Sequence, residues 1–253
     1  MSDHRFYVPP RQIIEGNVFL RGADVWHVQK VLRLAKGDTV IVFDGTGREY
    51  RVEISKCKSR EILGAVIEQW ERQAESPLRL TLVQGIPKGP KMDVIVQKAS
   101  EIGVQTIVPL QTERADVSAQ PRHLSATKAA QKLDRWARIG IEAAKQACRT
   151  TIPKIEPFLS VAEFLAQPLA ADLKLLFWEE EQQQSLKQVL KAQAGAIRSA
   201  VVVIGPEGGL TGSEAAQFTA QGYAPVSLGK RLLRTETAGI VALGILQYEY
   251  GDY

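Results

Sequence analysis

Ile204-Gly-Pro-Glu-Gly-Gly-Leu210 follows directly on Ala200-Val-Val-Val-Ile204, a short apolar run rich in β-branched residues. Such a run is typical of a strand that is covered on both faces of a sheet. The glycines of the motif allow its backbone to take positive φ and to approach a ligand closely, and Thr211 or Ser213 can cap a following helix. Because ligands bind at the carboxyl ends of strands in open α/β sheets, the motif predicts a ligand loop.

A second motif of the same kind is Ser227-Leu-Gly-Lys-Arg-Leu-Leu-Arg-Thr-Glu-Thr-Ala238. Residues 224–228 predict a short strand, Gly229 breaks it, and the loop that follows is basic. From Ala238 to Leu246 the pattern predicts a helix that is apolar nearly all round and built of small residues. Since glycine costs about 1 kcal/mol against alanine inside a helix, this helix must pack closely against other elements.

The composition is that of an ordinary globular protein, with 253 residues, 45% hydrophobic and 24% charged. No apolar run approaches the ~20 residues of a membrane helix, and the first residues lack the apolar core of a signal peptide, so we expect a cytoplasmic protein with no membrane contact. Two cysteines, Cys57 and Cys148, predict reduced thiols. Together with three histidines in unrelated contexts, they argue against a metal site.

A basic segment stands out against the modest net charge of +4. A helix is predicted over 126–148, and at helical spacing one face of the segment 128–149 gathers six cations: Lys128, Lys132, Arg135, Arg138, Lys145 and Arg149. Lysine and arginine supply phosphate contacts, so the face suits a nucleic acid. A merely solvated helix face is the alternative, and the segment alone leaves both open.

Residues 1 to about 72 predict a small β-barrel. Short strands are predicted over 39–43, 49–54 and 61–69, and Asp44-Gly-Thr-Gly47 is a hairpin signal. A short helix is predicted over 24–34, with Val28, Val31 and Leu32 on its inner side and Lys30 and Arg33 outside.

The polar stretch Gln73-Ala-Glu-Ser-Pro77 predicts a linker, so we expect a second domain over 78–253. There the pattern alternates between strands and helices, which is typical of a doubly wound parallel sheet. Strands are predicted over 78–84, 104–109, 173–178 and 200–204, and helices over 91–102, 126–148 and 185–194.

Common nucleotide and hydrolase motifs are absent. Gly229-Lys230 is followed by arginine rather than by the serine or threonine of a P-loop, and neither Gly-x-Gly-x-x-Gly after a strand nor Gly-x-Ser-x-Gly occurs. What remains is a ligand enclosed by the backbone of several loops. Residues 177–179, at the end of another predicted strand, could contribute an apolar rim and a carboxylate to such a site.

Taken together, these motifs resemble those of the knotted SPOUT methyltransferases, and most closely those of the 16S ribosomal RNA uridine-N3 methyltransferases. The resemblance covers nearly the whole chain. Besides the two glycine motifs it includes His4-Arg-Phe-Tyr-Val-Pro-Pro10, His27-x-x-x-Val31-Leu-Arg33, Pro87-Lys-Gly-x-Lys91-Met92, Gln97-Lys-Ala-Ser-Glu-Ile-Gly103, Glu142-Ala-Ala-Lys-Gln146 and Arg149.

This resemblance implies an α/β fold, with a knotted, doubly wound SPOUT domain over 78–253 preceded by a PUA-like RNA-binding barrel over 1–72. It also implies a homodimer that uses S-adenosylmethionine to methylate N3 of a uridine in small-subunit ribosomal RNA. The cofactor-binding residues it implies are Phe177, Trp178, Glu179, Ile204, Gly205, Pro206, Glu207, Gly208, Gly209, Leu228, Gly229, Leu232, Leu233, Thr235, Thr237 and Ala238.

Catalytic and RNA-binding candidates follow from the same resemblance. Cationic or hydrogen-bond-donating groups would stabilise the uridine anion, and the candidates are Arg234, Arg114, Arg149 and Gln146. Glu236 either holds an arginine or accepts the proton. The candidates for RNA contacts are His4, Arg5, Arg11, Arg33, Lys132 and Arg135, with Lys88 and Lys91 as phosphate clamps.

Two other functions stay open at this point. The chain could be a SPOUT methyltransferase that acts on transfer RNA or on a ribose 2′-oxygen. It could also be a ribosome-associated RNA-binding protein that has lost the methyl-donor site. Intact glycine loops argue against such a loss.

Overall fold

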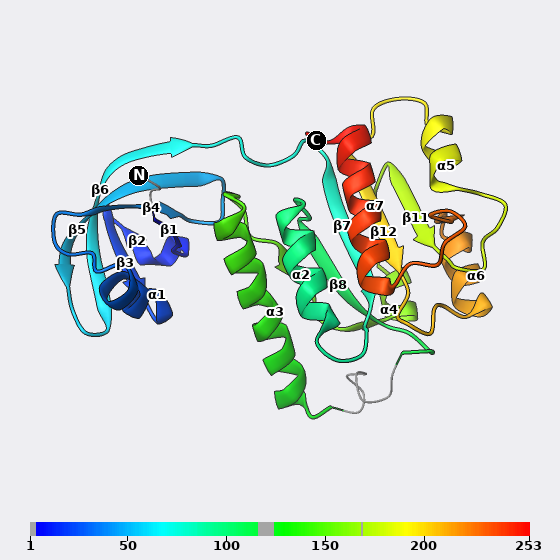
Figure 1. Ribbon diagram of the computed structural model, residues 1–253, viewed down its shortest axis with the longest axis horizontal. Helices are drawn as coiled ribbons and strands as arrows, with labels where there is room; N and C mark the ends of the chain where they lie inside the picture. Colours follow the sequence, from blue (N-terminus) through cyan, green and yellow to red (C-terminus); the bar gives the residue numbers. More distant parts are fainter. Residues whose placement is uncertain (1–3, 116–123, 168) are drawn as a thin grey trace. The chain divides into compact units, whose positions relative to one another are not determined.

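The structure is a computed structural model that describes residues 4–115, 124–167 and 169–253. The chain divides into two compact units (Figure 1). Each unit has a hydrophobic core of its own. Unit 1 comprises the residues up to 75 together with 144–152, and unit 2 comprises 76–143 and 153–253. The predicted domain boundaries, 1–72 and 78–253, stay a prediction.

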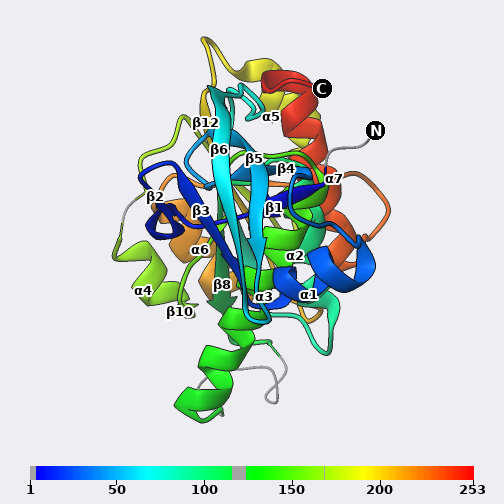
Figure 2. The same ribbon diagram turned by 90° about the vertical axis from the view of Figure 1, so that its left-hand side faces the viewer.

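Unit 1 is built on a mixed six-stranded sheet of order β1-β4-β5-β6-β3-β2, which faces the viewer in Figure 2. Strands β1 and β4 run parallel, and the other neighbours are antiparallel. The barrel-like sheet confirms the predicted β-rich domain. Its strands are β1 (Arg5–Tyr7), β2 (Ile13–Ile14), β3 (Asn17–Arg21), β4 (Thr39–Phe43), β5 (Arg48–Cys57) and β6 (Glu61–Glu71), and the short 3-10 helix η1 covers Pro10–Gln12.

The helical segment of unit 1 differs from its prediction. It consists of α1 (Ala23–Trp26) and a π-helical turn, η2 (His27–Val31), in which the N–H of Leu32 donates to the carbonyl of His27 at 2.9 Å. Val31 was predicted on the inner side, and this is wrong, because its side chain is 49% exposed while Val25 is buried instead. The wider i→i+5 turn shifts the helix phase away from the 3.6-residue repeat used for the prediction.

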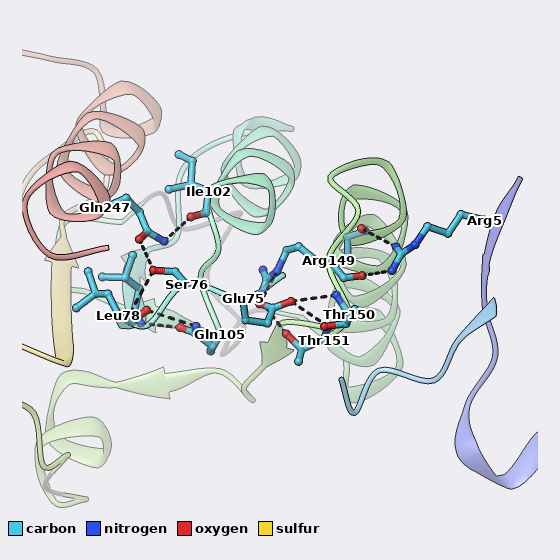
Figure 3. Close-up of polar contacts among 12 residues, drawn as sticks. Arg5, Glu75, Ser76, Leu78, Ile102, Gln105, Arg149, Thr150, Thr151 and Gln247 are labelled. Atoms are coloured by element: carbon cyan, nitrogen blue, oxygen red, sulfur yellow. Dashed lines mark hydrogen bonds and ion pairs between the residues drawn. The ribbon is translucent and has the colours of Figure 1, made fainter. Parts of the chain in front are cut away.

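Partly buried polar contacts join residues 144–152 to the rest of unit 1 (Figure 3). The carboxylate of Glu75 accepts hydrogen bonds from the guanidinium of Arg149 at 2.8 Å and from the N–H groups of Thr150 and Thr151 at 3.0 and 3.1 Å. Arg5 pairs with Glu49 and donates to the carbonyl of Arg149 at 2.6 Å. Burial alone would raise the pKa of Glu75, but the contacts with Arg149 and Thr151 lower it below its usual value.

Unit 2 is built on a parallel sheet of order β10-β8-β7-β12-β11-β13, with β9 beside β8. Every pair in this sheet is parallel, as predicted from the alternating pattern. The strands are β7 (Arg79–Gly85), β8 (Thr106–Gln111), β9 (Lys154–Ile155), β10 (Leu159–Ser160), β11 (Leu173–Phe177), β12 (Ser199–Ile204) and β13 (Ala224–Val226).

Helices cover both faces of this sheet, which confirms the doubly wound fold. Val202 of β12 packs in a core with α2, α5, α7 and Trp136 of α3, whereas its neighbour Val203 packs with α4 and α6. The helices are α2 (Lys91–Glu101), α3 (Ala126–Gln146), α4 (Val161–Leu165), α5 (Leu186–Ala192), α6 (Gly212–Ala220) and α7 (Thr235–Tyr250). Thr211 caps α6 as predicted, in a capping box with Glu214.

The C-terminal helix α7 packs as closely as its small residues predict. A Cβ on Gly239 would lie 3.8 Å from Ile204 and 4.0 Å from Leu82, so the helix lies directly against β12 and β7. Near its other end Gln247 is completely buried. Its side chain accepts from the Ser76 hydroxyl and donates to the Ile102 carbonyl, both at 2.7 Å (Figure 3). Polar contacts therefore fasten a helix that is otherwise held by apolar packing.

Candidate functional site

A cavity of about 920 Å³ lies in unit 2 at the carboxyl ends of β11, β12 and β13. Its walls are the loops that follow these strands together with the first turn of α7, which is the edge predicted for a ligand. Of the predicted cofactor-binding residues, those that line it are Phe177, Trp178, Glu179, Ile204, Gly205, Pro206, Glu207, Gly209, Leu228, Gly229, Leu232, Leu233, Thr235 and Ala238. Gly208 and Thr237 are outside this lining set.

The glycine loop after β12 is shaped by backbone contacts. Gly209 has φ +69°, and its N–H donates to the carbonyl of Pro206 at 3.0 Å. A Cβ at Gly209 would overlap the carboxylate of Glu179, while one at Gly208 would lie 2.8 Å from the backbone oxygen of Arg114. Gly209 therefore needs glycine for its conformation, since the Glu179 carboxylate can move aside, and Gly208 needs it for close approach to the backbone of Arg114.

A buried hydrogen-bond network joins the ends of β7 and β12 to the start of α7. The side-chain amide of Gln84 donates to the hydroxyl of Thr235 at 2.9 Å, and that hydroxyl donates to the carbonyl of Gly205 at 2.6 Å. Gln84 and Thr235 are both buried. Gln84 is not among the predicted site residues, although a lone amide at the end of an apolar strand is a signal that could have singled it out.

Glu207 connects the glycine loop to the loop after β7. Its carboxylate accepts from the ammonium of Lys91 at 2.7 Å and from the backbone N–H of Lys88 at 3.1 Å. Partial burial raises the pKa of Glu207, but the hydrogen bonds from Lys91 and from backbone N–H groups outweigh it and lower the pKa below its usual value. Glu207 therefore stays ionised at neutral pH. Lys91, predicted as a phosphate clamp, lines the cavity.

The cavity has an apolar wall and a basic rim. The apolar wall includes Phe177 and Ile204, which are buried, and Leu232 in the loop before α7 is 85% exposed. Lining residues absent from the predicted site are Glu181, Gln182, Ser185, Val226, Ser227, Lys230 and Arg231. Most of them lie in the polar loop before α5 or beside β13, where no periodic pattern indicates which side chains turn inward.

The predicted catalytic residues fall into two groups. Arg234 lines the cavity as the N-cap residue of α7, Glu236 follows in the first turn, and Arg114 donates to the carbonyl of Leu210 at 3.3 Å. Gln146 and Arg149 belong to unit 1 instead. Arg149 was also expected on the basic helix face, and this is wrong: α3 ends at Gln146, Cys148 takes φ +56°, and the Arg149 guanidinium is buried against Glu75.

The predicted RNA-binding residues also differ in exposure. Arg11, Arg33 and Lys88 are exposed, and His4 and Lys132 are half-buried. The Arg5 side chain is only 10% exposed and is paired internally with Glu49, so its contacts in this structure are structural. Arg135, on α3, is exposed but forms an ion pair with Asp93 of α2.

Metal clusters and membrane-spanning helices are both absent from the described residues. Within the described ranges, no cluster of three or more histidine, cysteine, aspartate or glutamate side chains could hold a metal ion. None of the described helices is both long and apolar enough to cross a bilayer.

Comparison with protein families matches both units. Residues 74–247 match the family model described as an RNA methyltransferase domain, and residues 20–66 match the RNA methyltransferase PUA domain. The chain is 32% identical over 243 residues to the ribosomal RNA small subunit methyltransferase E of Bacillus subtilis, which covers 94% of this chain and 93% of that protein. It is 34% identical over 240 residues to the protein of the same name from Synechocystis, and the match covers 95% of this chain and 76% of that protein.

Solved structures agree over the full length. The ribosomal RNA small subunit methyltransferase E of Neisseria gonorrhoeae, bound to S-adenosylmethionine, is 32% identical with a TM-score of 0.86, over 100% of both chains. A Legionella pneumophila protein in complex with the same cofactor is 31% identical with a TM-score of 0.89, again over 100% of both chains.

Proposed function

Because this chain belongs to the ribosomal RNA small subunit methyltransferase E family, we propose that it transfers the methyl group of S-adenosylmethionine to N3 of a uridine in 16S ribosomal RNA. Its two family matches, and the relatives that it matches over nearly their whole length, support an S-adenosylmethionine-dependent ribosomal RNA methyltransferase. The choice of N3 and of uridine rests on the motif resemblance.

The observation that carries this proposal is the cavity in unit 2. Three loops from the carboxyl ends of neighbouring parallel strands enclose it, and two of them are the glycine motifs. Its volume of about 920 Å³ lies within the range of small-molecule sites, roughly 300–1,000 Å³. Its position is that of a ligand site in an open α/β sheet.

The lining residues fit S-adenosylmethionine. The apolar wall that includes Phe177, Ile204 and Leu233 suits an adenine ring, and the loops that follow β11, β12 and β13 supply polar groups for the rest of the ligand. When bound, the cofactor supplies a methyl group on a cationic sulfonium. The protein's own work is then to hold the acceptor atom in line with that group and to stabilise the acceptor as its proton leaves.

We assign the stabilising role to arginines beside the cavity. The imide at uridine N3 is a weak acid, so its anion is the reactive form, and a cation preorganised next to it lowers the cost of forming it. Arg234 lines the cavity, and Arg114 contacts the glycine loop at Gly208 and Leu210. One carboxylate oxygen of Glu236 is buried without a hydrogen-bond partner in the described structure, which suits a group that accepts a proton or receives an arginine.

RNA contacts are proposed for both units. The PUA-family match covers residues 20–66 of unit 1, which include the exposed Arg33, while Arg11 is exposed outside that match, and α3 carries Lys128 and Arg138 on exposed positions in unit 2. Such contacts supply affinity through phosphates and counterion release. Ribosomal RNA as the substrate also motivates a cytoplasmic location.

We further propose a homodimer through α7 and a C-terminal knot like that of SPOUT enzymes. Val241 and Tyr248, at i and i+7 on α7, are 37% and 73% exposed, Gly244 between them has open space, and Val94 on the adjacent α2 is 45% exposed. A self-complementary partner would bury this stripe. The knot rests on the motif resemblance, and a threaded C-terminal segment would be held by the bond of Thr235 to the glycine loop and by the bonds of Gln247 to Ser76 before β7 and to Ile102 after α2.

Mass spectrometry of ribosomal RNA tests the reaction. RNA from cells without this gene is expected to lack one N3-methyluridine in 16S RNA, and the purified protein with S-adenosylmethionine should restore it. Methylation of transfer RNA or of a ribose oxygen would instead support another SPOUT activity. Failure of the protein to bind S-adenosylmethionine in calorimetry would favour a non-catalytic RNA-binding protein.

Light scattering tests the dimer. The expected mass is twice the 27.9 kDa of the chain, and Tyr248→Glu should shift it toward the monomer by placing a charge in the apolar stripe. Glu249→Gln, an adjacent exposed change, is the matched control. A wild-type monomer with full activity contradicts the dimer, and an experimental structure whose C-terminal segment pulls free of the chain contradicts the knot.

A further inference from the structure

Unit 1 has a second hollow, which the proposed chemistry does not use. It has a volume of about 600 Å³, and its lining includes Trp26, Gln29, Lys30, Ser59 and Arg60. Trp26 is 63% exposed. An indole ring held at the surface is informative here because tryptophan is highly buried on average and because this ring lines a hollow beside two cations.

The fold of unit 1 holds this tryptophan outward. Val25 and Val28 bury the inner side of the helical segment, so Trp26 between them faces solvent. The amide of Gln29 donates to the carbonyl of Lys58 at 2.9 Å and ties the helical segment to the turn between β5 and β6. That turn carries Ser59 and Arg60. The two sides of the hollow are therefore fixed to each other.

The hollow is positively charged. Lys30 and Arg60 line it, and no acidic residue is among its lining residues within the described chain. The nearest acids in the sequence are engaged elsewhere: Asp24 pairs with Lys145 at 3.2 Å, and Glu61 pairs with Arg21 at 2.7 Å and with Lys58 at 3.4 Å. Their partners offset these negative charges and leave the cations of the hollow to act on a ligand.

We infer that this hollow binds an unpaired nucleotide of the RNA substrate, with the base stacked on Trp26 and the flanking phosphates beside Lys30 and Arg60. The inference rests on the proposed function for the identity of the substrate. A flat aromatic face flanked by cations is how proteins hold single-stranded nucleic acid, since every base offers a π-face. Trp26 is the one exposed apolar side chain among the lining residues of this part of the structure, which favours one base over an apolar protein surface.

Trp26 lies outside the motifs that the chain shares with its family resemblance. The shared segment keeps His27, Val31 and Arg33 and leaves the preceding position undefined. Trp26 is therefore not one of the residues on which the resemblance rests, and the platform adds a substrate contact in unit 1 to those proposed for the cavity of unit 2.

The test uses the full-length protein and two RNA probes of equal length, a single-stranded fragment of 16S RNA and a blunt duplex. Trp26→Ala should weaken binding of the single strand by roughly 5- to 150-fold, from a stacking contribution of about 1–3 kcal/mol per base. Trp26→Phe should keep most of the affinity. Ile67→Ala, which removes an equally isolated side chain, 53% exposed on β6, is the matched control and should change nothing.

Further readouts separate this inference from the proposed function. Trp26→Ala should raise KM for RNA while leaving kcat, the S-adenosylmethionine affinity and the melting temperature unchanged. If wild-type protein methylates RNA and Trp26→Ala binds the single strand as tightly as wild type, the platform is refuted, and a protein partner becomes the better occupant. Equal weakening on the duplex also overturns the unpaired-base assignment. Absence of methylation by wild type refutes the proposed function instead.

Discussion

The cavity of unit 2 and the hollow of unit 1 are built in opposite ways. The cavity takes its shape from backbone: three loops, the conformation of Gly209, and a buried network from Gln84 through Thr235 to Gly205. The hollow takes its properties from exposed side chains, chiefly Trp26.

This difference has physical consequences. A site made of backbone is specific because its shape cannot adapt cheaply, so a single added methyl group disrupts it. A platform of exposed side chains tolerates variation, and its affinity responds to salt. The first kind suits one invariant cofactor, and the second suits a polymer substrate whose contacts are many and individually modest.

Gly209→Val should have the largest effect. Valine at φ +69° is strained by about 1–3 kcal/mol, and its side chain would displace Glu179 from the loop. We expect roughly a hundredfold or greater loss of S-adenosylmethionine affinity by calorimetry. Gly212→Val is the matched control, because a Cβ there meets no atom within 4 Å. Unchanged affinity in Gly209→Val would remove the loop from the cofactor site.

Arg149→Met tests whether the stability of unit 1 depends on the ion pair between Arg149 and Glu75. The Arg149 side chain is 4% exposed and that of Glu75 is 21% exposed. Removing one partner of a buried pair costs about 3–5 kcal/mol, and partial access of Glu75 to water places this case toward the lower end. Urea unfolding measures it.

The control for that substitution is Arg135→Met, which breaks a pair whose arginine is 67% exposed. Such pairs contribute about 0–1 kcal/mol, so stability should hardly change. Equal losses in the two variants would contradict the structural role of Arg149.

Much of the fold could be predicted because it depends on local patterns. The apolar run before Gly205 and the all-round apolar helix after Arg234 indicate buried elements by composition alone. No local pattern in the sequence indicates that residues 144–152 belong to unit 1. Their contacts there include the pairing of Arg149 with Glu75, which is more than seventy residues away in the sequence. Val31 was misplaced for a related reason, because no residue pattern announces a π-turn.

The candidate site was predictable to the extent that backbone defines it. Glycines and strand ends mark the loops, so the two motifs pointed to most of the lining residues. Glu181 and Ser185 were missed, because which side of a polar loop turns inward depends on tertiary packing. The resemblance also grouped Arg149 with the catalytic residues, whereas burial against Glu75 gives it structural contacts here.

Thr235→Val and Thr237→Val compare two threonines in the first turn of α7, one inside the buried hydrogen-bond network and one outside the cavity lining. The Thr235→Val substitution keeps the side-chain shape but removes the hydroxyl that bonds to both Gln84 and Gly205, while Gln84 keeps its bonds to the carbonyls of Gly85 and Gly205. We expect a stability loss of about 0.5–1.5 kcal/mol per lost hydrogen bond together with weaker S-adenosylmethionine binding. Thr237→Val, at an exposed position outside the cavity lining, should change neither in melting and calorimetry. If only Thr237→Val lost affinity for S-adenosylmethionine, the roles proposed for the two threonines would be wrong.

Acid should destabilise unit 1 by a smaller amount, through protonation of Glu75. Its folded pKa is lower than the usual 4.5, because Arg149 and Thr151 outweigh the effect of burial. The contribution is therefore complete above pH 4.5 and is lost as pH falls through the folded pKa. In Glu75→Gln, the free energy of unfolding measured with urea should depend less on pH between about pH 6 and 3. A wild-type pH profile in the variant would exclude Glu75 as the source of the dependence.

Lys132 and Arg135 should show the smallest effects, and they test whether side-chain binding extends to α3. Both were predicted to contact RNA, but Arg135 already pairs with Asp93, and Asp93 also accepts from the indole of Trp136 at 3.2 Å. Lys132→Gln should weaken RNA binding a few-fold and lower the slope of affinity against salt by about one. Arg135→Gln should have a smaller effect, because Arg135 would have to leave Asp93 to reach a phosphate. Binding titrations over a range of salt concentrations measure both. A steeper loss for Arg135→Gln would show that the ion pair with Asp93 opens on the RNA.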